Sequence, residues 1–573
     1  MSHLRPAILL VLLLALARTL YLAWFSPYGL AEDEAFYSLW SQHPAWSYNT
    51  KGPGIAWAMF ASTSVFGHSA FGVRMVAVLA CAVGALATAA LCRDLTASVA
   101  HKARAAFLGA AIYNLIPAAQ ALGLLATIDG PYLACWALAA LGAWWSLTAR
   151  RASGPLLLAL GLGLGFLFKY TILLFLPGVL VLLLAALRRN RAGLPRPLAF
   201  LASAALFALF LAPVFIWNAQ HDWATVKHLL GHLGLAPDLS RLPAPPTTPG
   251  TATPTTFPLK YTFELLGTQL ATVGPLTVAA FFAWRARKRL TTLHAAAPAF
   301  CLALAAPILL FYLAVSFNSS VEGNWPLAGW LAFIPLVIAW WQSAQPIAPP
   351  AANANATTPA NPPPIRFATL APPHGTLRFF FNAIAIYGLV AGLAMLRLDL
   401  LRAALEPVAP AIARAIPIGR LIGADAMTAH VLRLAGEHHA SNPARPAPFI
   451  LCQHYGRGSQ LEFALRSGSV PIPPLLLAAG FTPTVYISQS RMGGRQVQHD
   501  FWPGHSLDQP ALLGKDAIII ADSPDPAVWW PFFDSVTPIN QPDPTLDGGL
   551  RGTRFGLIGR GFKGFPPAQP NRF

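Results

Sequence analysis

Hydrophobic residues in this chain are gathered into long blocks, and short polar stretches separate one block from the next. Most blocks approach the length of about 20 residues that an α-helix needs to cross the hydrocarbon core of a bilayer. Backbone polar groups in lipid must bond within their own segment, so we predict that each block is a transmembrane helix. The eleven predicted spans are residues 6–25, 75–92, 105–125, 131–149, 155–168, 171–187, 198–217, 261–284, 295–317, 326–341 and 379–396.

The apolar run 154–187 is longer than one span but short for two. Lys169 lies at its middle, and arginines precede and follow it, which indicates that both ends face the cytoplasm. We predict either two short spans that turn at the outer surface or a re-entrant pair.

Basic residues are concentrated in alternate loops, as the positive-inside rule describes for cytoplasmic loops. The clusters around Arg93, Arg150, Arg188 and Arg287 therefore mark the cytoplasmic side, and the N-terminus lies there too. Loops 26–74, 126–130, 218–260 and 318–325 are then predicted to lie on the outer side of the membrane.

Composition agrees with a membrane protein, because 55% of the residues are hydrophobic and 11% are charged, against roughly 25% charged residues in soluble domains. The formal net charge of +17 does not indicate nucleic-acid binding, since the basic residues lie in short loops and form no stripe with interleaved aromatic residues. The five cysteines show no disulfide or metal-binding spacing. The predicted fold class is a polytopic α-helical membrane protein.

Four parts follow along the chain. Residues 1–345 hold the first ten spans, 346–378 form a linker rich in Pro and Ala, and 379–396 form the last span. The tail, 397–573, alternates short β-like runs with turn residues and helical pattern, which predicts a small α/β domain with strands at Phe449–Cys452, Thr484–Ser488 and Ala517–Ala521. Eleven spans place this tail outside, whereas Arg397 and Arg402 favour the opposite side.

Two acidic sites stand out at the predicted outer surface. Glu32, Asp33 and Glu34 directly follow the first span, in a chain with only 22 acidic residues. A carboxylate there can act as a general base for an acceptor hydroxyl or hold a metal ion, and a solvated loop is the plain alternative. Asp129 lies in a very short turn between two spans, where it can react or simply cap the next helix.

Basic and aromatic residues add to this side. Lys51 and Lys169 can neutralise a phosphate near the headgroups, although a lone lysine or Arg18 can also just extend to the interface. Glu322 and Trp325 can line a sugar site, or belong to an interfacial aromatic belt. The convergence of these charges on one face favours an enzyme that acts on a lipid-linked anionic substrate.

Seven strings within residues 1–345 carry a resemblance to a known family. They are Glu32-Asp33-Glu34-Ala35-Phe36-Tyr37-Ser38-Leu39-Trp40, Trp46-Ser47-Tyr48-Asn49-Thr50-Lys51-Gly52-Pro53, Gly72-Val73-Arg74, the turn from Ala126 to Pro131, Gly165-Phe166-Leu167-Phe168-Lys169-Tyr170, Ile216-Trp217-Asn218-Ala219-Gln220-His221-Asp222-Trp223 and Glu322-Gly323-Asn324-Trp325-Pro326. In this order they resemble the GT-C glycosyltransferases related to protein O-mannosyltransferases and the lipid A aminoarabinose transferase (glycosyltransferase family 39-like). The resemblance implies a GT-C-like fold that carries a small C-terminal α/β domain.

The resemblance implies transfer of a sugar from a polyprenyl-phosphate donor to a lipid, protein or glycan acceptor, with inversion, at the periplasmic face of a bacterial cytoplasmic membrane. Asp33, Glu34 and Asp129 match the catalytic acidic positions. The positions expected to bind the donor phosphate or the substrate are Lys51, Lys169, Arg18, Tyr37, Glu322, Asn324 and Trp325.

One string departs from the family pattern. Asn49 and Thr50 stand before Lys51 where many members carry an acidic or histidine residue, so the use of a divalent metal and the class of acceptor stay open. No other cofactor is expected. The alternative functions are a transporter or flippase of lipid-linked sugars and a membrane scaffold that presents the tail. Nucleic acid is not an expected partner.

Overall fold

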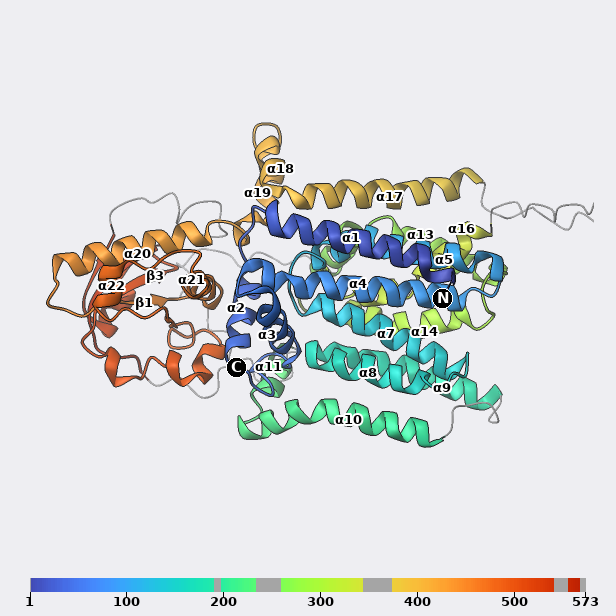
Figure 1. Cartoon of the computed structure of the whole chain (residues 1–573), viewed down its shortest axis with the longest axis horizontal. Coiled ribbons are helices and arrows are strands. Elements are labelled where there is room, and N and C mark those ends of the chain that lie inside the picture. The colour runs from blue at the N-terminus through green and yellow to red at the C-terminus, as the bar shows by residue number, and fades with distance from the viewer. Residues whose placement is uncertain (1, 190–196, 233–258, 344–373, 540–554, 567–573) are drawn as a thin grey trace, which may run out of the picture.

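The computed structural model describes residues 2–189, 197–232, 259–343, 374–539 and 555–566. Long helices lie side by side in a bundle, and a smaller domain built around a sheet adjoins one end of it (Figure 1). The bundle helices are α1 (Arg5–Trp24), α4 (Ala70–Leu95), α5 (Val99–Leu115), α6 (Pro117–Leu122), α7 (Asp129–Leu147), α8 (Gly154–Phe168), α9 (Leu176–Arg189), α10 (Pro197–Gln220), α12 (Lys260–Thr272), α13 (Leu276–Arg285), α14 (Ala297–Val315), α15 (Leu327–Leu331), α16 (Ile334–Gln342) and α17 (His374–Leu396).

Every one of the eleven predicted hydrophobic segments is helical in the structure. Within the described residues, six helices are long and apolar enough to cross a membrane, or seven if the pair α12 and α13, bent by 97°, is one span. The remaining predicted segments are shorter or broken. α5 ends just before Pro117, whose ring and missing N–H do not fit inside a helix. The polytopic helical membrane fold is thus confirmed.

The run 154–187 divides at Lys169, where the sequence predicted a turn. Lys169 is extended, with φ −152° and ψ 121°, and separates α8 from the short 3-10 helix η2 (Tyr170–Phe175) that precedes α9. Glycines hold α8 tightly against α7. A Cβ added to Gly142 would lie 2.3 Å from the backbone nitrogen of Leu158, so this close helix contact needs a residue without a side chain.

Three short helices cover the end of the bundle that faces the smaller domain: α2 (Glu32–Gln42), α3 (Gly54–Phe66) and α11 (Ala224–His232) (Figure 1). Residues 346–373 of the predicted linker lie outside the described part of the chain. The last five residues of that linker are helical, because α17 begins at His374 and not at the predicted residue 379. After α17 the helices α18 (Leu398–Leu405) and α19 (Pro410–Ala415) lead into the smaller domain.

The C-terminal domain has a five-stranded sheet in the order β2-β1-β3-β5-β4. β1 is parallel to β2 and β3, and β5 is antiparallel to β3 and β4. The three strands predicted from sequence are present, and β4 and β5 were not predicted. The bounds are α20 (Ala424–Ser441), β1 (Phe449–Cys452), α21 (Tyr455–Ser467), α22 (Pro474–Ala478), β2 (Val485–Ile487), β3 (Ala517–Ala521), β4 (Phe533–Pro538) and β5 (Phe555–Phe562).

Candidate active site between the bundle and the C-terminal domain

Glu34 is the fully buried anchor of the loop that follows α1. Its carboxylate accepts hydrogen bonds from Nε and Nη2 of Arg74 on α4, at 3.0 and 2.8 Å. It also accepts from the backbone N–H of Ala31 at 2.9 Å and of Ala126 at 2.8 Å. Both oxygens are therefore bonded, and Glu34 ties the start of α2 to α4 and to the turn before α7. A buried carboxylate needs such partners, because burying an unpaired charge is very unfavourable.

Asp33, next to this anchor, has a different environment. Its side chain is exposed to solvent, and the Tyr455 hydroxyl from α21 donates a hydrogen bond to Oδ1 at 3.3 Å. Surrounding protein groups displace enough water to raise the pKa of the Asp33 carboxyl, while the Lys51 ammonium opposes that rise and Glu32 adds to it. Asp33 is thus an accessible carboxylate whose proton affinity is above the ordinary value.

Asp129 and Lys169 form an ion pair with 2.7 Å between Nζ and Oδ1. The second oxygen of Asp129 accepts a hydrogen bond of 2.9 Å from Nδ2 of Asn324. The Lys169 ammonium also lies 5.6 Å from the ring centre of Tyr132 and 5.5 Å from that of Trp325. The start of α7, the end of α8 and the loop before α15 therefore meet here, which brings four sequence-predicted residues together.

Lys51 lies beside this ion pair. Its loop approaches the end of α8 so closely that a Cβ added to Gly52 would be 2.4 Å from the carbonyl oxygen of Leu167. Desolvation and the Lys169 charge lower the pKa of Lys51, whereas Asp33 and Asp129 act in the opposite direction. Within the described residues the Lys51 ammonium has no hydrogen bond or ion pair. The Lys51 ammonium is therefore close to the charges of Lys169, Asp33 and Asp129, and its N–H groups are available to a ligand.

The structure places only one of three other predicted residues near the acidic residues and lysines of the candidate site. Tyr37 is buried, and burial together with the nearby Asp33 charge raises the pKa of its phenol, so it faces the same group of residues. Arg18 lies against Gly123, with Nε 3.1 Å from the point where a Cβ would stand, and no described contact joins it to the acidic residues. Glu322 is exposed, and the contact recorded for it is its backbone carbonyl with the Trp325 N–H.

The C-terminal domain supplies residues that sequence reasoning missed. Tyr455 is one of them, and a Glu32–Arg457 ion pair of 3.1 Å lies beside it. The Asn49 N–H donates to Oε1 of Gln498 at 2.8 Å, which fixes the loop just before Lys51. The one available signal was position: Tyr455 and Arg457 follow a parallel strand, β1, at the carboxyl end where α/β domains often bind ligands.

Residues 50–217 match the model of a family described as dolichyl-phosphate-mannose-protein mannosyltransferase. The match covers less than half of the chain, so this segment is similar to that glycosyltransferase family. It contains Lys51, Asp129 and Lys169, whereas Asp33, Asn324 and Tyr455 join them from outside it.

A curated relative is the lipid A galacturonosyltransferase RgtD of Rhizobium johnstonii, which is 33% identical over 233 residues. That match covers 39% of this chain and 46% of the relative, so the chain spans somewhat less than half of the relative's length.

Two crystal structures of ArnT from Cupriavidus metallidurans resemble the whole chain. The apo structure has a TM-score of 0.52 at 15% identity, covering 96% of this chain and 97% of that one. The structure bound to undecaprenyl phosphate has a TM-score of 0.54 at 16% identity, with the same coverage. This likeness shows the fold alone: a multi-pass helical membrane bundle of the GT-C architecture with a small C-terminal domain.

Proposed function

We propose that this protein is a glycosyltransferase that takes a sugar from a polyprenyl-phosphate carrier at the outer face of a bacterial cytoplasmic membrane. The observation that carries the proposal is the Lys51 ammonium, which has no partner within the described residues and lies beside a second lysine. Such a pair suits a phosphate, because an ammonium is a good partner for its charged oxygens. The solved ArnT structure with undecaprenyl phosphate and the family match at 50–217 support this reading.

The chemistry is a single displacement. The acceptor hydroxyl attacks the anomeric carbon, its oxygen forms the new glycosidic bond, and its proton passes to the Asp33 carboxylate. The bond between the anomeric carbon and the phosphate oxygen breaks, and the polyprenyl phosphate leaves with the electron pair. Lys51 and Lys169 stabilise the negative charge that grows on this phosphate. One displacement inverts the anomeric centre.

The other candidate residues position the proposed base and the two lysines. Asp129 and Asn324 hold Lys169 in place, and the Asp129 charge reduces the repulsion between the two ammonium groups. Glu34 positions the loop that carries Asp33, since its oxygens are all occupied. The partly exposed ring of Trp325 offers aromatic surface for the sugar. We assign a lipid as the first acceptor to test, because the curated relative acts on lipid A.

Turnover by the purified full-length protein in nanodiscs tests the proposal. With a panel of polyprenyl-phosphate sugars and a lipid A acceptor, release of free polyprenyl phosphate would be followed by mass spectrometry. We expect Asp33→Asn to reduce turnover by at least about a hundredfold, the lower bound of a general-base contribution, while undecaprenyl phosphate still binds. The control is Asp425→Asn, an exposed carboxylate on α20.

Two results would contradict the assignment. The first is full turnover by Asp33→Asn, which would mean that Asp33 takes no part in the reaction. A loss of turnover in the control Asp425→Asn would show instead that the substitutions damage the protein in general. Movement of an unchanged donor across a sealed bilayer, without release of the sugar, would favour the flippase alternative. Nothing in the described structure favours that alternative now.

A further inference from the structure

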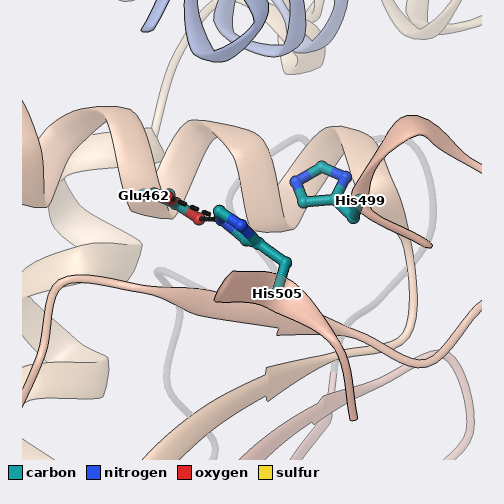
Figure 2. Close-up of side chains that lie close together, drawn as sticks. All are labelled: Glu462, His499 and His505. Carbon is teal, nitrogen blue, oxygen red and sulfur yellow. Dashed lines mark hydrogen bonds and ion pairs between the residues drawn. The ribbon is translucent and has the colours of Figure 1, made fainter. Parts of the chain in front are cut away.

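A second polar cluster lies inside the C-terminal domain, apart from the residues proposed for sugar transfer. It consists of Glu462 on α21, His499 in the 3-10 helix η6 (Gln498–Phe501) and His505 at the end of η7 (Pro503–His505). Figure 2 shows Glu462 and His505 pointing toward each other, with His499 nearby. One ligand atom from each lies within 4.8 Å of the others, and the residues are 0%, 1% and 4% exposed.

The hydrogen bonds of this cluster are incomplete. Nε2 of His505 lies 2.9 and 3.0 Å from the two oxygens of Glu462. Both ring nitrogens of His499 and Nδ1 of His505 are buried and have no partner within the described residues. Buried side-chain nitrogens nearly always have a partner, so three without one beside a buried carboxylate point to a missing ligand.

We infer that Glu462, His499 and His505 bind a transition-metal ion of the Zn²⁺ class. Two imidazoles and one carboxylate form a ligand set that Zn²⁺ uses in proteins, and its bonds of about 2.0–2.1 Å would draw the three side chains closer together. Groups behind the carboxylate are in place, because Nε of Arg466 donates to Oε1 at 2.7 Å and the Val485 N–H donates to Oε2 at 3.1 Å. Hydrogen bonds of this kind orient a metal-binding carboxylate.

The position of the cluster places the ion at the contact between the C-terminal domain and α2. The His499 ring stacks on Phe36 of α2, with ring centres 5.5 Å apart and planes at 11°. His505 lies edge-on to His43 at the end of α2, with ring centres 5.7 Å apart. An ion that fixes both histidines would therefore hold the face of the C-terminal domain against the helix that carries Asp33. The residues come from this domain and do not include Asp33, Asn49 or Lys51.

The test is metal content, which does not depend on the proposed transferase activity. The untagged full-length protein would be stripped with a chelator, incubated with ZnCl₂, passed through a desalting column and analysed by inductively coupled plasma mass spectrometry. His499→Phe is the main variant, because it keeps the aromatic stack on Phe36 but removes both ring nitrogens. His438→Gln is the control, since His438 lies in the same domain and pairs with Asp516 instead.

We expect about one zinc ion per chain in the unaltered protein and in His438→Gln, and at least about tenfold less in His499→Phe. Zinc should raise the unfolding temperature of the first two and leave that of His499→Phe unchanged. Glu462→Gln should behave like His499→Phe, so the inference does not depend on one variant folding. A folded protein that stays free of zinc, or a His499→Phe variant that binds as much zinc as the unaltered protein, would overturn it.

Discussion

At the scale of single residues, the Tyr455 hydroxyl and the Asp33 carboxylate make a testable pair. A hydrogen bond to a carboxylate favours its charged form, so Tyr455→Phe should raise the pKa of Asp33 further above its usual range. The proposed base must be ionised to accept a proton. The variant should therefore lose rate severalfold on the acidic side of the pH profile and approach the unaltered rate as the pH rises through the new pKa.

The measurement is the rate of donor consumption against pH, with Tyr486→Phe on β2 as the control from the same domain. A displaced acidic limb with an unchanged plateau would support a role of Tyr455 through Asp33. An equal loss at every pH would instead mean that Tyr455 only supports the local structure.

Three neighbouring carboxylates show what the sequence can and cannot predict at this scale. Their position after the first span singles them out, yet each has a different partner: Glu32 meets Arg457, Asp33 meets Tyr455 and Glu34 meets Arg74. No local pattern links Asp33 to Tyr455, because the two are 422 residues apart in the chain. Their roles follow from burial and partners, which only the folded chain defines.

At the scale of elements, Glu34 joins α2, α4 and the turn before α7. Glu34→Gln keeps the shape of the side chain but leaves the Arg74 guanidinium, also buried, without its counter-charge. Removing one partner of a buried ion pair typically destabilises a protein by about 3–5 kcal/mol. We expect a clear drop in the unfolding temperature in detergent, together with loss of turnover.

Asp33→Asn is the matched comparison, since Asp33 is exposed and its loss should leave the unfolding temperature almost unchanged. The two variants then separate a positioning carboxylate from a reacting one. If Glu34→Gln lost turnover but kept its unfolding temperature, Glu34 would have to be assigned to the reaction itself.

The helices were easier to predict than the strands for a physical reason. Each hydrophobic block must become a helix in lipid, so all eleven segments are helical. β5 was missed because its sequence is rich in glycine, which has little strand preference. The fold explains one of these glycines: a Cβ added to Gly559 would lie 2.6 Å from the Phe533 ring of the neighbouring strand β4. That requirement arises from strand pairing and leaves no signal in the local pattern.

At the scale of the whole molecule, the charges divide between the two ends of the bundle. α2, which carries Asp33 and Glu34, and α3, which follows Lys51 in the chain, lie at the end next to the C-terminal domain (Figure 1). The basic loops that follow α4 and α7 contact each other, since Arg151 pairs with Asp94 at 3.3 Å. The loop after α4 also contacts the loop before α14, where Thr96 forms a backbone bridge with Leu293. That the end next to the C-terminal domain faces the outer side stays a prediction from the basic loops.

The docking of the C-terminal domain onto α2 gives the last prediction. Arg457 is 1% exposed and forms the 3.1 Å ion pair with Glu32, while its Nη1 donates to Gln460 at 2.9 Å. Gln460 in turn donates to the Leu30 carbonyl at 2.7 Å, so this one side chain supports two connections between the domain and the loop. Arg457→Met should weaken the docking by about 3–5 kcal/mol, the usual effect of breaking a buried ion pair.

Hydrogen exchange followed by mass spectrometry would report this directly. The amides of α2 should exchange faster in Arg457→Met, and turnover should fall although Asp33, Lys51 and Lys169 are all intact. Arg433→Met is the control, because Arg433 pairs with Glu437 on the exposed face of α20 and such surface pairs contribute at most about 1 kcal/mol. Unchanged exchange in α2 would mean that the bundle holds the loop without the domain. Tyr455 would then be a neighbour of the site rather than part of what positions it.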